Sequence, residues 1–178
     1  MSRPRSDTRE RIQDVARELF LQQGVQRTSL QDIADKLGIT KPALYYHFAS
    51  REELIRSIVQ PLIDEGEQFI AEREGRGGVD VRELLEGYFD FHYRHRRDLV
   101  VVLAEFAILE DLGLIEKVLA WRERLGKLVF GPKPTLAQAT RAVIAFGGLQ
   151  DCCLQFPDAP VEKLRAAAVE GALAALGL

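Results

Sequence analysis

A cationic and aromatic cluster lies between residues 40 and 49. Lys41, Tyr45, Tyr46 and His47 fall within this segment, and no carboxylate interrupts it. Such side chains donate hydrogen bonds to phosphate oxygens and reach base edges, whereas an acidic group would be repelled by the dense negative charge of a duplex. The segment is therefore suited to contact with DNA.

The helix that precedes this cluster is short and clearly patterned. Its apolar residues recur at the spacing of one helix face: Leu30, Ile33, Ala34 and Leu37. Thr28 or Ser29 is expected to cap its start, with Gln31 or Asp32 completing a capping box. Gly38 is expected to end it, because glycine adopts the left-handed backbone that a sharp turn needs.

A second short helix is expected from about residue 41 to residue 47, capped by Thr40. Pro42 is tolerated near its start, where the backbone N–H has no partner within the helix. Ile39 is expected to fill the space under the turn, and Leu44 to face the core. Helix, glycine turn and helix together form a helix-turn-helix candidate, which places its second helix in the major groove.

Helical periodicity covers nearly all of the chain, and no strand is expected. Apolar repeats predict helices over residues 7–23, 30–37, 41–47, 51 to about 73, 81–94, 99–109, 114–129, 135–154 and 161–176. Pro61 either kinks the fourth of these helices or lies within it while the helix continues. We predict an all-α fold of about nine helices, with a three-helix helix-turn-helix head (residues 1–50) and a helical ligand-binding and dimerisation domain (residues 51–178).

Composition restricts the class of protein. Of 178 residues, 47% are hydrophobic and 29% charged, which is typical of a globular chain. The net charge of −3 divides into +2 over the first 60 residues and −5 over the rest, so the head is the more basic part. No apolar run is long enough to span a membrane and the start is no secretory signal, so a cytoplasmic protein is expected.

Catalytic and metal-binding patterns are absent from the sequence. It has no GxSxG, P-loop, GxGxxG or HExxH motif. His92 and His95, at helical spacing, lack a nearby cluster of further ligands, so no metal is expected. The adjacent Cys152 and Cys153 are expected to be unbonded and inert in apolar surroundings. We therefore expect no cofactor and no enzyme activity.

Residues 28–48, TSLQDIADKLGITKPALYYHF, closely resemble the DNA-binding signature of the tetracycline-repressor (TetR) family. The ending Leu-Tyr-Tyr-His-Phe and the following Ser-x-x-Glu-Leu are its most diagnostic parts, and the resemblance extends over about residues 9–58. It implies a cytoplasmic bacterial regulator, usually a repressor, that binds a palindromic operator as a homodimer. A small effector bound in the C-terminal domain commonly releases such regulators from DNA.

The resemblance also implies which residues contact DNA. Expected phosphate contacts are Thr28 or Ser29, Thr40, Tyr46, His47 and Arg51. Expected base-facing residues are Gln31, Lys41, Ala43 and Tyr45, with Pro42 and Ala43 beside a thymine methyl. Tyr45 and Tyr46 are neighbours on one helix, so one is expected to pack while the other meets DNA. The tail from Arg3 to Arg5 either adds contacts or is a disordered terminus.

Two further surfaces are expected in the C-terminal domain. Small and uncharged faces predict a dimer interface of Ala139, Val143, Gly147, Gly148, Val161, Leu164, Ala168 and Ala172; burial within one subunit is the alternative. An apolar or aromatic effector is expected among Phe69, Leu85, Tyr88, Phe89, His92, Leu103, Phe106, Leu109, Trp121, Leu125, Phe146 and Gln150. An aromatic stripe can equally be core.

A different class of protein stays open at this point. A helical small-molecule-binding protein or an enzyme that retains a degenerate head would show the same helical patterning. DNA binding distinguishes the two, because only the regulator needs affinity for a palindrome that falls steeply with salt.

Overall fold

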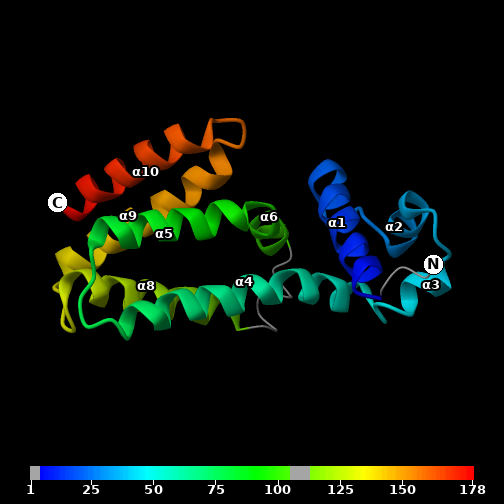
Figure 1. Ribbon diagram of the computed structural model, residues 1–178, viewed down its shortest axis with the longest axis horizontal. Coiled ribbons are helices and arrows are strands. Elements are labelled where there is room, and N and C mark those ends of the chain that lie inside the picture. Colours follow the sequence, from blue (N-terminus) through cyan, green and yellow to red (C-terminus); the bar gives the residue numbers. More distant parts are fainter. Residues whose placement is uncertain (1–4, 105–112) are drawn as a thin grey trace. The chain divides into compact units, whose positions relative to one another are not determined.

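The all-α prediction is confirmed. A computed structural model describes residues 5–104 and 113–178, and these ranges contain nine helices and no strand (Figure 1). No helix of the described residues is long and apolar enough to cross a membrane. The helices are α1 (Arg5–Gln23), α2 (Leu30–Leu37), α3 (Lys41–Tyr45), α4 (Arg51–Glu74), α5 (Val81–Arg94), α6 (Arg96–Ala104), α8 (Leu114–Phe130), α9 (Leu136–Gln155) and α10 (Val161–Leu176).

The chain divides into two compact units. The described residues of the first are 5–63 and 97–104, and those of the second are 64–96 and 113–178. The first unit includes the start of α4, which the sequence assigns to the C-terminal domain. One reason is that Gln13 on α1 donates a hydrogen bond to the Ser57 hydroxyl at 2.8 Å. Helix α4 contributes residues to both units.

The core of the first unit is built from the apolar stripes that the sequence predicts. Its fully buried side chains include Ile12, Ala16 and Phe20 on α1, Ile33 and Ala34 on α2, and Leu44 and Phe48 at α3. Burial of these residues holds α2 and α3, two short helices that would be marginal in isolation. The unit therefore presents α2 and α3 on a packed base.

Helix α4 continues through Pro61 to Glu74 without a break. Hydrogen bonds of Ser50 and Glu53 cap its start. The Ser50 hydroxyl accepts the Glu53 backbone N–H at 3.1 Å, and the Glu53 carboxylate accepts the N–H of Ala49 at 2.7 Å.

Helix α9 is central to the second unit, where it packs against α5, α8 and α10 (Figure 1). The buried core includes Leu84, Leu85, Tyr88, Phe89, Leu125, Ala142, Phe146, Leu149, Cys153, Leu164, Ala168 and Ala172. Because these residues come from four helices, the unit is a helical bundle rather than a helix pair.

Candidate nucleic-acid interface

The turn between α2 and α3 is determined by hydrogen bonds at both ends of α2. Ser29 is the N-cap: its hydroxyl accepts the Asp32 N–H at 3.2 Å, and Asp32 accepts the Ser29 N–H at 2.8 Å. The capping box thus uses Ser29 and Asp32, and these hydrogen bonds lower the pKa of Asp32. At the other end Gly38 has φ +65° and donates its N–H to Asp35 O at 3.1 Å. The left-handed glycine lets α3 begin after only two more residues.

Helix α3 is one turn long and shorter than expected. Thr40 caps it by accepting the Ala43 N–H at 3.3 Å, and Pro42 lies in the first turn. The helix ends at Tyr45, because the next N–H groups close a tighter turn, with His47 N–H donating to Leu44 O at 2.9 Å. That turn brings Phe48 into the core.

The exposed side of this motif carries most of the residues that the sequence assigns to DNA. Leu44 is fully buried, while Tyr45 is 44% and Tyr46 is 66% exposed. The expectation that one tyrosine packs is wrong, because Leu44 and Phe48 already fill the core side of so short a helix. The remaining exposed residues assigned to DNA are Ser29, Gln31, Thr40, Lys41, Pro42 and Ala43, and His47 is half-buried.

Thr28 and Arg51 have other roles in the structure. Thr28 is buried, and its hydroxyl donates to Gly24 O at 2.9 Å. Arg51 donates to Val25 O at 2.6 Å and to Thr28 O at 3.3 Å. Both side chains therefore bind the backbone between α1 and α2, and the phosphate contact expected of Thr28 or Ser29 is better served by Ser29.

Arg9 on α1 is a supporting residue that sequence reasoning missed. Its guanidinium donates to His47 O at 2.6 Å and lies over the Phe48 ring, 4.1 Å from the centroid. It thereby holds the end of α3. The only signal in the sequence is a cation on the first helix, which does not indicate a partner 38 residues away.

In the second unit, several residues expected to bind an effector form an aromatic cluster. Tyr88 lies 4.1 Å from the His92 ring, 5.1 Å from Phe146 and 6.2 Å from Phe69, measured between centroids. Leu85, Phe89 and Leu125 are buried in the same core. Trp121 donates to Glu67 at 2.8 Å, and Gln150 is half-buried.

One of the described residues expected to bind an effector is not part of this cluster. Leu103 belongs to the first unit and is 68% exposed. Phe106 and Leu109 lie outside the described residues, as does the tail at Arg3.

Burial sets the protonation of groups in the second unit. It lowers the pKa of His92 to about 4, so this ring is uncharged at neutral pH. His92 Nδ1 lies 3.0 Å from Tyr88 O, which favours the tautomer with the proton on Nδ1. Burial also raises the pKa of Tyr88, of Cys152 and of Cys153, the last to about 12, so both unbonded cysteines are protonated thiols.

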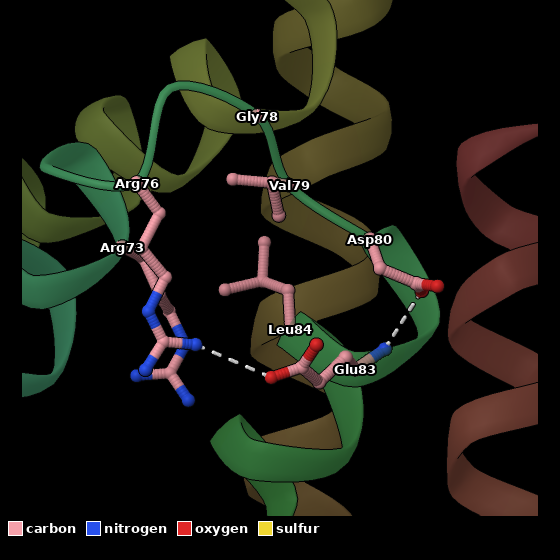
Figure 2. Close-up of a pocket in the computed structure, with 7 residues that line it drawn as sticks. All are labelled: Arg73, Arg76, Gly78, Val79, Asp80, Glu83 and Leu84. Carbon is pink, nitrogen blue, oxygen red and sulfur yellow. Dashed lines mark hydrogen bonds and ion pairs between the residues drawn. The ribbon is translucent and has the colours of Figure 1, made fainter.

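The pocket beside the loop from Gly75 to Gly78 is too small for an effector. Figure 2 shows Asp80 accepting the Glu83 N–H at 3.0 Å and Arg76 pairing with Glu83 at 3.4 Å. Its volume is about 30 Å³, far below the roughly 300–1,000 Å³ of ligand pockets. This pocket belongs to the cap of α5.

The residues predicted for a dimer interface divide into two groups. Leu164, Ala168 and Ala172 are at most 8% exposed and belong to the core of their own unit. These three side chains therefore pack within one chain and not against a second copy. Ala139 and Val143 line a groove that α9 forms with α8, Gly147 and Val161 are half-buried, and Gly148 is exposed.

Comparison with known proteins matches the first unit to a sequence family. Residues 12–58 match the family described as "Bacterial regulatory proteins, tetR family". The HTH-type transcriptional regulator TtgR of Pseudomonas putida is 33% identical over 88 residues, which are 47% of this chain and 42% of that protein. The HTH-type transcriptional regulator AcrR of Shigella flexneri is 48% identical over 52 residues, 29% of this chain and 24% of that one. The matched part thus spans about two fifths or less of these relatives.

Solved structures resemble the chain over nearly its whole length. A transcriptional regulator (TerR/AcrR family) from Aquifex aeolicus VF5 has a TM-score of 0.72 at 27% identity, covering 92% of this chain and 96% of the other. A TetR-like transcriptional regulator from Rhodococcus sp. RHA1 has a TM-score of 0.71 at 23% identity, covering 99% of both chains. The second likeness concerns the fold alone.

Proposed function

This chain belongs, through residues 12–58, to the tetR family of bacterial regulatory proteins, and we propose that it is a ligand-responsive transcriptional repressor. It binds a palindromic operator as a homodimer, and a small effector releases it. The observation that carries the proposal is the exposed face of α3, which follows the left-handed Gly38 and bears Lys41, Tyr45 and Tyr46 without a carboxylate. The proposal implies a cytoplasmic protein and assigns it no catalytic activity.

In the proposed complex α3 enters the major groove. Lys41, Ala43 and Tyr45 face base edges together with Gln31 from α2. Ser29, Thr40, Tyr46 and His47 contact phosphates, because they supply hydroxyl and N–H donors at the starts of α2 and α3 and at the end of α3. Thr28, Arg51 and Arg9 act through the backbone that they hold, and do not themselves touch DNA.

A second copy is required by the palindrome, and α9 and α10 offer the surface for it. Leu136 and Ile144 on α9 are 82% and 64% exposed, and Gly148 beside them is exposed. On α10 the exposed residues include Ala167, Gly171 and Ala174 at helical spacing. Large apolar and small residues together suit the close approach of helices in a four-helix bundle between two copies.

Selection of binding sites from a random DNA pool tests the proposal. The selected site should be palindromic, and its affinity should fall steeply between two salt concentrations. Lys41→Ala should weaken binding, whereas Lys133→Ala, which removes an equal charge from an exposed loop of the second unit, should not. Failure of the intact dimer to select any DNA would favour a helical small-molecule-binding protein or enzyme with a degenerate head.

A further inference from the structure

Arg122 on α8 occupies a position that the pattern of its helix reserves for an apolar residue. It lies four residues after Val118 and three before Leu125, on the same stripe of the helix. The Arg122 Nε is buried and has no hydrogen-bond partner among the described residues. Two residues later, Arg124 is bound by Glu67 at 2.6 Å and by Glu74 at 2.7 Å. The helix thus carries one fully compensated guanidinium and one that is not.

The guanidinium of Arg122 lies between α8 and α9. Its Nη2 is 3.7 Å from the position that a Cβ on Gly147 would take, so it lies against the α9 backbone. The preceding residue, Phe146, contacts Tyr88, which in turn contacts His92. The positive charge of Arg122 lowers the pKa of Tyr88, which burial raises. It also lowers the pKa of His92, in the same direction as burial. The aromatic cluster therefore has a cation at its edge.

The same residue lines an apolar groove between α8 and α9. The groove has a volume of about 250 Å³, and its walls include Leu119, Gly126, Ala142 and Val143. Glu123 also lines it, but pairs with Lys127 at 2.6 Å, so its charge is compensated. A groove of this kind accepts hydrocarbon, and Arg122 is the polar group that orients what enters.

A buried guanidinium N–H without an acceptor costs free energy that an anion would recover. Carboxylates are the organic anions whose two oxygens match the planar guanidinium. The site contains one permanent positive charge, because His92 is neutral at physiological pH, and so favours a singly charged ligand over a phosphate dianion.

We propose that the effector of this protein is an organic carboxylate with an apolar body, and that Arg122 binds its carboxylate group. The groove between α8 and α9 receives the apolar body. The inference rests on the proposed function and names the chemical class of its effector. It adds an anionic group to the apolar or aromatic molecule that the sequence predicts.

Calorimetric titration of the full-length protein with a series of carboxylates, from benzoate to palmitate, tests the proposal. At least one should bind, and the primary amide with the same body should bind about tenfold more weakly or worse. Arg122→Gln should reduce carboxylate affinity by about the same factor and leave the amide unaffected. Lys117→Gln, which removes an exposed charge from the same helix, should bind like the wild type. Equal affinity for carboxylate and amide, equal affinity of Arg122→Gln and wild type, or no binding in the series overturns the proposal.

Thermal unfolding without ligand separates binding from a structural role. Because Arg122 Nε has no acceptor in the described part of the chain, Arg122→Gln and Arg122→Met should unfold at the wild-type temperature or above it. If both variants unfold at a lower temperature or fail to fold, Arg122 is a structural residue and the proposal is wrong.

Operator binding distinguishes this inference from the proposed function. Arg122→Gln should bind the selected operator as wild type does and should no longer be released by the carboxylate. If carboxylate binding depends on Arg122 but the protein has no affinity for DNA, the effector site is supported and the proposed regulatory function is overturned. If the protein binds DNA but no carboxylate of the series changes that binding, the proposed regulatory function is supported and the proposed effector class is overturned.

Discussion

Arg17 and Asp98, which are 81 residues apart in sequence, form an ion pair in which Nε lies 2.5 Å from a carboxylate oxygen. The pair joins α1 to α6 within the first unit, and the two side chains are 20% and 12% exposed. Arg17 also pairs with Asp14 at 3.0 Å, but the Asp14 side chain is 74% exposed. One arginine thus has a sheltered and a solvated partner.

The first prediction compares these two partners. Asp98→Asn should lower the free energy of unfolding by about 2 kcal/mol, because it removes the sheltered counter-charge of Arg17 and leaves only the solvated Asp14. Asp14→Asn should change it by less than about 0.5 kcal/mol, because solvent screens an exposed pair. Urea denaturation of both variants measures the difference. Equal losses would show that the α1–α6 contact is as solvated as the pair within α1.

Gly38 supports a prediction about the turn. Its φ of +65° is unfavourable for any residue with a Cβ, although no atom lies within 4 Å of where that Cβ would be. Gly38→Ala should therefore cost about 1 kcal/mol through backbone strain alone, and should weaken operator binding by displacing α3.

Gly78→Ala is the matched control for Gly38→Ala, since its Cβ would also meet open space but its φ is not in the left-handed region. It should be neutral or slightly stabilising. Urea denaturation and operator titration of both variants measure the difference. If Gly38→Ala is as stable as Gly78→Ala, the left-handed geometry of the turn is contradicted.

Tyr46 should separate DNA binding from folding. Because the residue is 66% exposed, Tyr46→Ala should change the free energy of unfolding by no more than about 1 kcal/mol. Its operator affinity should fall about tenfold, and Tyr46→Phe tells whether the hydroxyl or the ring is responsible. Leu44→Ala, two residues away and fully buried, should instead cost about 2–5 kcal/mol. Unchanged DNA affinity in Tyr46→Ala would remove Tyr46 from the interface.

His92 makes stability depend on pH. Its pKa is about 4 in the folded chain and near 6.5 when unfolded, so below about pH 6.5 the unfolded chain takes up a proton that the folded chain does not. Stability should fall by about 2 kcal/mol between about pH 7 and about pH 5 on account of this residue. His92→Phe should remove that part of the slope in urea denaturation. Parallel pH profiles of the variant and wild type would indicate that His92 is solvated.

Local features of the sequence were enough to predict the helices and several of their ends, although α3 ends two residues earlier than predicted and α6 begins three residues earlier. The periodicity of α5 predicts Val81–Arg94, and Ser29, Gly38 and Thr40 mark the turn around which α2 and α3 are built. Such signals are readable because a cap or an apolar stripe depends on residues within one or two turns of the same helix. The acid-free run from residue 40 to residue 49 is equally local, so the candidate DNA-contacting segment could be found without a structure.

Tertiary structure decided which of the expected side chains are available. Thr28 and Arg51 face the α1–α2 backbone, both tyrosines of α3 are exposed, and Leu164 lies in the core of its own chain. Arg122 lies on the apolar stripe of α8, and its guanidinium lies against the backbone of α9. Each outcome depends on which distant helix packs beside a residue, because burial and hydrogen bonding are set by long-range contacts that one helix's sequence does not encode.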